Sequence, residues 1–141
     1  MQNYFAKNIK SGSVLFDAIE SACAGLIYIS ETDSALLPFA GTKTSSIDSA
    51  TILRQARRKP NEAVEEVSFE RFFERLTEIK DWFGELEKAR AEKFIGLQKL
   101  LAENLGGLRV YRIGRVKVEI LVVGLDVDGC VMGIATQAVE T

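Results

Sequence analysis

The chain of 141 residues contains no histidine, only two cysteines and only two prolines. Without histidine, the protein has no imidazole to activate a nucleophile or to bind a metal. The two thiols, Cys23 and Cys130, form no C-x-x-C motif, and each lies among apolar residues. This pattern favours reduced core cysteines in a cytoplasmic protein over a disulfide or a reactive thiol.

Long apolar runs are also missing from the sequence. No segment approaches the roughly 20 apolar residues that a membrane-spanning helix requires. Residues 1–13 contain no continuous apolar stretch of the kind found in secretion signals. We therefore expect a cytoplasmic protein that does not associate with membranes.

A strong excess of either charge is absent, because 18 basic and 20 acidic residues give a formal net charge of −2. Proteins that bind nucleic acid directly carry a clustered basic surface, so this balance argues against direct nucleic-acid binding. A protein that imitates DNA over its whole surface would need a large acidic excess. Any action on a nucleic-acid enzyme would therefore depend on a few placed groups.

The length and composition of the chain indicate one globular domain. Hydrophobic residues make up 47% and charged residues 27%, which is ordinary for a soluble protein. Residues 1–12 are polar and mixed, and we expect them to be loosely ordered. Residues 13–141 are expected to form a single domain, most simply a monomer.

Apolar periodicity and capping residues predict the elements of this domain. Residues at helical spacing predict helices over 13–24, 49–58, 69–76 and 85–105. Short β-branched and aromatic runs predict strands over 26–29, 35–40, 64–67, 116–123 and 130–139, with another that begins at Val110. The expected fold is α+β, with a mostly antiparallel sheet of about five or six strands flanked by helices, close to an α/β/α sandwich.

Two strand pairs frame the predicted sheet. Strands 26–29 and 35–40 are expected to form a hairpin with Glu31 at its tip. Pro38 cannot donate a ladder hydrogen bond, so its strand should lie at an edge or contain a bulge. The strand 116–123 becomes apolar on both faces toward its end, which predicts a central position with helices above and below.

Two close pairs of carboxylates, Glu31/Asp33 and Asp126/Asp128, are the main candidates for chemistry. The second pair resembles the start of a calcium loop, but the downstream bidentate glutamate is missing, so a hairpin turn explains it better. Glu31 and Asp33 could serve as the acid and base of an uncharacterised hydrolase, although turn chemistry is the simpler interpretation. We assign no catalytic residue and expect no cofactor.

Two further features point to a surface contact or to a helix end. A basic cluster lies just before Pro60 and comprises Arg54, Arg57, Arg58 and Lys59. Cations favour a helix C-terminus, so the cluster is explained by the predicted helix, with a phosphate site as the alternative. Trp82 lies in a charged connector and is a candidate interface anchor.

Several segments, taken in order along the chain, are similar to one known family. They are Gly25–Glu31, Ser68–Phe73, Asp81–Trp82, Val110–Gly114 and Gly133–Thr141. Together they resemble the nuclease A inhibitor (NuiA-like) family, and the similarity runs in order from Leu15 to Thr141.

The resemblance implies a protein inhibitor rather than an enzyme. Members of that family block a metal-dependent, sugar-non-specific endonuclease of the ββα-metal type by occupying its active site. The implied partner is therefore a nuclease protein. The alternative is a non-catalytic binding module of the same fold that engages a different partner through the Lys80–Trp82 region and the basic cluster.

The resemblance also implies which residues contact the partner. Glu31 corresponds to the acidic residue that engages an arginine in the nuclease site. Thr141 corresponds to the C-terminal threonine that reaches the catalytic magnesium of the nuclease, so it would be a metal ligand only in the complex. Trp82 matches an aromatic interface residue. Glu140 and Lys80 complete the expected contact set, and Lys80 replaces a neutral amide of the best-known member.

Overall fold

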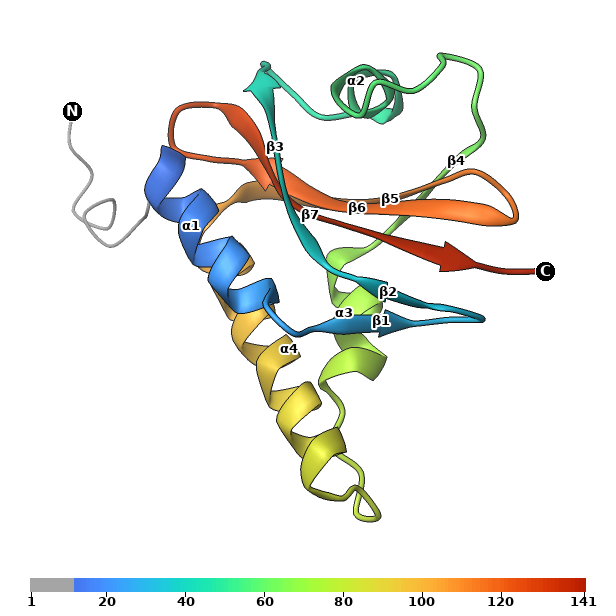
Figure 1. The fold of residues 1–141 in the computed structure, drawn as a ribbon. Coiled ribbons are helices and arrows are strands. Elements are labelled where there is room, and N and C mark those ends of the chain that lie inside the picture. The colour runs from blue at the N-terminus through green and yellow to red at the C-terminus, as the bar shows by residue number, and fades with distance from the viewer. Residues whose placement is uncertain (1–11) are drawn as a thin grey trace.

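A five-stranded antiparallel sheet forms the centre of the molecule, of which the computed structural model describes residues 12–141 (Figure 1). In sheet order its strands are β3 (Leu37–Lys43), β7 (Cys130–Val139), β6 (Lys117–Leu125), β5 (Gly106–Ile113) and β4 (Val64–Val67). The last three strands of the chain fill the middle of the sheet, as the terminal apolar pattern predicted. A separate two-stranded sheet pairs β1 (Ile27–Ile29) with β2 (Asp33–Ala35).

Helices cover both faces of the main sheet (Figure 1). One face packs against α1 (Gly12–Cys23), α3 (Phe69–Thr77) and α4 (Glu85–Asn104), and the other against α2 (Ser49–Gln55). The alternation within β6 accounts for this division. Val118, Ile120 and Val122 join the first apolar cluster, whereas Leu121 and Val123 join the second. Each fully buried aliphatic side chain contributes about 1.5–3 kcal/mol. The predicted α+β fold is confirmed.

The β1–β2 hairpin lies beside the end of β7. Ile29 pairs with Asp33, so residues 30–32 form the hairpin tip, as predicted. The hydroxyl of Thr136 in β7 donates to the carbonyl of Ala35 at 2.9 Å and fastens β2 to the main sheet. Pro38 lies in β3, which is an edge strand, and this prediction is also confirmed.

The predicted strand 35–40 is in fact two strands. β2 ends and β3 begins on either side of Leu36, which is buried and donates its N–H to the carbonyl of Leu26 (3.4 Å). The chain therefore leaves the small sheet and enters the large one at this residue.

The predicted helix 49–58 ends earlier than expected. Arg57 has a left-handed φ of 58°, and the N–H of Arg58 bonds back to the carbonyl of Leu53 at 2.8 Å. This bond pattern closes a helix at its C-terminus. α2 therefore stops at Gln55.

Turn geometry accounts for the acidic residues between β6 and β7. The carboxylate of Asp126 accepts hydrogen bonds from the N–H groups of Asp128 and Cys130, each at 2.9 Å. The hairpin interpretation therefore explains this segment.

The loosely ordered segment expected over 1–12 lies outside the described residues, except for Gly12, which is the first residue of α1. None of the helices described in residues 12–141 combines the length and apolar composition of a membrane-spanning helix.

Candidate functional site

Glu31 and Thr141 meet at one edge of the molecule. The carboxylate of Glu31 accepts the main-chain N–H of Thr141 at 2.7 Å. It also accepts the Thr141 hydroxyl, at 2.8 Å to Oε1 and 3.1 Å to Oε2. The β1–β2 turn and the C-terminus project from the same side of the sheet (Figure 1). Two residues that the sequence connected only through a family resemblance are thus in direct contact.

Backbone contacts fix the hairpin tip against β7. The N–H of Glu31 donates to the carbonyl of Val139 (3.3 Å), and the N–H of Val139 donates to the hydroxyl of Ser30 (3.0 Å). The N–H of Ser30 in turn donates to the carbonyl of Thr32 at 2.9 Å. The position of the Glu31 side chain is therefore set by the end of the main sheet as well as by its own turn.

Glu140 faces a different neighbour. Its carboxylate forms an ion pair with Arg112 of β5 (2.5 Å), whose side chain is only 18% exposed. The N–H of Glu140 donates to the carbonyl of Val116 at 2.9 Å. Arg112 also approaches Glu65 of β4 at 3.4 Å. The last two residues of the chain are thus held from both sides, by Arg112 through Glu140 and by Glu31 through Thr141.

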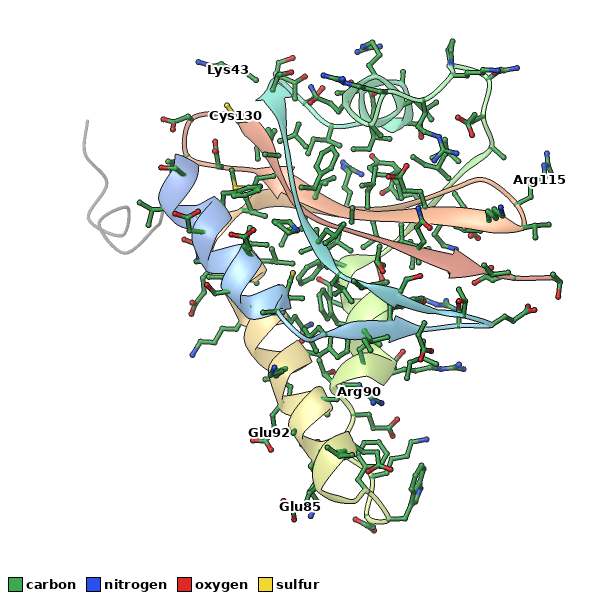
Figure 2. The ribbon with its side chains drawn as sticks, in the orientation of Figure 1. Lys43, Glu85, Arg90, Glu92, Arg115 and Cys130 are labelled. Atoms are coloured by element: carbon green, nitrogen blue, oxygen red, sulfur yellow. The ribbon has the colours of Figure 1, made fainter. Side chains whose placement is uncertain are left out.

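Hydrogen bonds from Thr141 favour the ionised form of the Glu31 carboxyl. The hydrogen bond from the N–H of Thr141 is the main cause that holds the pKa of the Glu31 carboxyl below its ordinary value of 4.5, and the bond from the Thr141 hydroxyl is the second. Glu31 is therefore ionised at neutral pH. Figure 2 shows Arg115, in the turn between β5 and β6, on the same side of the molecule. The edge thus carries an ionised carboxylate at Glu31 and a cation at Arg115.

Trp82 and Lys80 lie elsewhere, in the connector between α3 and α4. The Trp82 side chain is 72% exposed and packs edge-on against Phe83, with ring centroids 4.9 Å apart. The Lys80 ammonium lies 5.8 Å from the centroid of the Trp82 ring, within the range of a cation–π contact. This connector is at the lower end of Figure 1, away from the hairpin tip.

Two hollows lie on the side of β1 that faces the helices. A hollow of about 300 Å³ is lined on one side by Ile27 and Ile29 of β1 and on the other by Trp82 and Phe83. A larger hollow of about 1030 Å³ between β1 and α3 continues from Ile29 to Arg112. Ile29 of the hairpin therefore borders both hollows.

The helix-end explanation of the basic cluster holds only for Arg54, because α2 ends at Gln55 and the other three cations follow it. Arg58 forms ion pairs with Glu62 (2.5 Å) and Glu119 (2.7 Å). Arg54 donates to the Thr51 hydroxyl at 3.4 Å within α2. No group of three or more His, Cys, Asp or Glu side chains suited to hold a metal ion occurs among residues 12–141.

Sequence reasoning missed Ser30 and Arg112. Ser30 carried no signal beyond a small turn residue. Arg112 did carry one, because it interrupts a strand in which Val110, Tyr111 and Ile113 are all buried. A cation inside such an apolar run predicts a carboxylate partner.

One comparison identifies relatives of this chain. The model of the family described as "nuclease A inhibitor-like protein" matches residues 13–141. No curated protein matches the chain. Since the family match spans nearly the whole sequence, the chain belongs to the nuclease A inhibitor-like family.

Proposed function

We propose that this protein inhibits a metal-dependent, sugar-non-specific endonuclease by occupying its active site with Glu31 and Thr141. Membership in a family of nuclease inhibitors supports a non-catalytic role and a nuclease partner. The observation that carries the proposed mechanism is the contact between the Glu31 carboxylate and the N–H and hydroxyl of Thr141.

The chemistry of these two residues suits a nuclease site. Mg²⁺ prefers hard oxygen ligands and keeps exchangeable waters, which the hydroxyl of Thr141 and a carboxylate that ends the chain there could replace. An arginine that normally holds a phosphate can instead pair with Glu31. The two groups together imitate the charged oxygens of a scissile phosphate.

The contact between them favours tight binding because it orders both groups before the partner arrives. A carboxylate offers about four acceptor positions, and Thr141 supplies only two hydrogens, one from its N–H and one from its hydroxyl, so positions remain for an arginine. Groups that are already ordered lose less conformational entropy on binding. We further propose that exposed Trp82 forms a second contact, because aromatic anchors dominate many interfaces.

The deciding experiment is a titration of a ββα-metal nuclease with three forms of the protein. They are the chain that ends at Thr141, the chain without Thr141, and the chain extended beyond Thr141 by a short tag. We expect stoichiometric inhibition by the first form only. A chain with the same tag at its N-terminus is the control and should inhibit fully.

The outcomes separate the alternatives. Full inhibition by the C-terminally tagged form would exclude a free carboxylate at Thr141 as the metal ligand. If no form inhibits, whereas a different protein is bound with a dependence on Lys80 and Trp82, the alternative of a binding module with another partner is favoured. That alternative draws on the exposed cation–π pair far from the hairpin tip.

A further inference from the structure

We propose that Arg112 is a positioning residue: by holding Glu140 against β5, it directs the end of the chain toward Glu31. The inference rests on the proposed function, because the purpose of that direction is to present Thr141 to a nuclease site. In this proposal Arg112 acts through Glu140 and does not itself contact the metal of the nuclease.

The geometry of Arg112 is that of a clamp. Its side chain in β5 is only 18% exposed, whereas that of Glu140 is 48% exposed. Its guanidinium approaches the Glu140 carboxylate at 2.5 Å. The guanidinium is therefore held in place by the sheet around it, and it offers a charge-assisted hydrogen bond to a carboxylate that is itself half exposed.

The chain end has few other restraints. The pairing of β7 with β6 ends at Val139, opposite Lys117. Beyond it, the main chain of Glu140 makes one bond, to Val116, and that of Thr141 makes one, to Glu31. Loss of the Arg112 contact would therefore leave Glu140 with only its bond to Val116, and Thr141 with only its bonds to Glu31.

Electrostatics point the same way. Glu31, Glu140 and a terminal carboxylate at Thr141 would repel one another if they stood alone. The Arg112 guanidinium is placed beside Glu140 and offsets part of that repulsion. It thereby stabilises an edge rich in carboxylate groups before any partner supplies cations.

The sheet contains a matched control for this pair. Arg109 lies on the same strand and pairs across to Glu66 of β4 at 2.8 Å. Both of those side chains are about half exposed, 45% and 47%, and neither touches the chain end. Replacing Arg109 therefore removes a similar ion pair without releasing Glu140.

The test uses four variants: Arg112→Gln, Arg112→Lys, Glu140→Gln and the double variant Arg112→Gln/Glu140→Gln. Arg109→Gln is the control. Two quantities are measured: inhibition of a ββα-metal nuclease, and the pKa of Glu31 in the free protein by NMR of its carboxyl carbon. Arg112→Gln should weaken inhibition by roughly ten- to a hundredfold, as expected when one or two residues lose their order. It should also raise the pKa of Glu31 toward 4.5, since Thr141 then donates to it less often.

The other variants sharpen the result. Arg112→Lys should inhibit better than Arg112→Gln and should show a lower pKa of Glu31. The double variant should inhibit as well as Arg112→Gln does. Arg109→Gln should change neither quantity. If Arg112→Gln lowers the melting temperature but leaves the pKa of Glu31 and the hydrogen exchange of the Thr141 amide unchanged, Arg112 is merely structural and the proposal is wrong.

The two readouts also separate this inference from the proposed function. If the unaltered protein inhibits no nuclease, the proposed function fails. The pKa of Glu31 and the exchange of the Thr141 amide then still decide whether Arg112 directs the chain end.

Discussion

The main-chain N–H and the hydroxyl of Thr141 both donate to the Glu31 carboxylate, although 110 positions separate the two residues. Each partner orients the other. Thr141 fixes the plane of the carboxylate, and Glu31 fixes the last peptide unit. Variants of either residue should therefore affect both ends of the proposed contact surface.

Replacing Glu31→Gln should weaken nuclease inhibition by roughly 30-fold or more, because an arginine of the partner would lose its ionised acceptor. The melting temperature should change little, since the side chain is exposed. Competition assays and thermal denaturation would measure the two effects. Glu92→Gln on the outer side of α4, labelled in Figure 2, is the matched control and should leave inhibition intact. Equal inhibition by both variants would remove Glu31 from the site.

The contact between Glu31 and Thr141 should be lost in acid. The folded-state pKa of Glu31 lies below its ordinary value of 4.5, so the contact stabilises the fold fully above about pH 4.5. It is then lost as the pH falls through the lower, folded-state pKa. An NMR titration should show the amide signal of Thr141 moving only in that acidic range. A midpoint at or above 4.5 in the intact protein would contradict the contact. Glu31→Gln should abolish this transition.

Truncating Trp82→Ala should lower affinity for the nuclease by about 2 kcal/mol if this ring anchors the interface. Stability should be almost unchanged, because the side chain is 72% exposed. Calorimetric titration and thermal melting would measure the two quantities. Val127→Ala, in the turn between β6 and β7 at the opposite side of Figure 1 from the C-terminus, serves as the control. An unchanged affinity for Trp82→Ala would confine the interface to the hairpin and chain end.

Two glycines should respond to alanine in opposite directions. A Cβ at Gly133, in the middle of β7, would lie 1.8 Å from the carbonyl oxygen of Val122 on β6. Gly133→Ala must therefore push the central strands apart, and we expect a loss of about 3 kcal/mol or more. A Cβ at Gly96, inside α4, meets no atom within 4 Å, so Gly96→Ala should add about 1 kcal/mol. Urea denaturation of both variants tests the pair, and a mild effect at Gly133 would disprove the close approach.

Local signals in the sequence predicted most of the fold. Ser68 caps α3, since its hydroxyl accepts the N–H of Arg71 at 3.1 Å, and the phenylalanine spacing placed the helix correctly. The division of strand 35–40 was not predictable, because only the partners of Leu36 decide where the chain changes sheets. The early end of α2 was missed for a similar reason: Arg57 holds the left-handed position that glycine usually marks.

The site was less accessible to sequence reasoning than the fold. Glu31 and Thr141 entered separately, through a resemblance, and nothing in the residues near either one indicates their contact. That contact needs the hairpin to lie along β7, which the bond from Thr136 to Ala35 secures. Long-range pairing of this kind is fixed by topology and is invisible to local patterns.

The pairing of β3 with β7 joins Leu37 to Ala135 and so closes most of the chain into a single loop. Such contacts slow folding, because the entropy of loop closure is lost before the contacts reward it. The hairpin tip and the chain end lie together only when β7 is in its place beside β3 and the hairpin. The proposed contact surface thus depends on the native topology. We therefore expect a short peptide copied from either end to lack it.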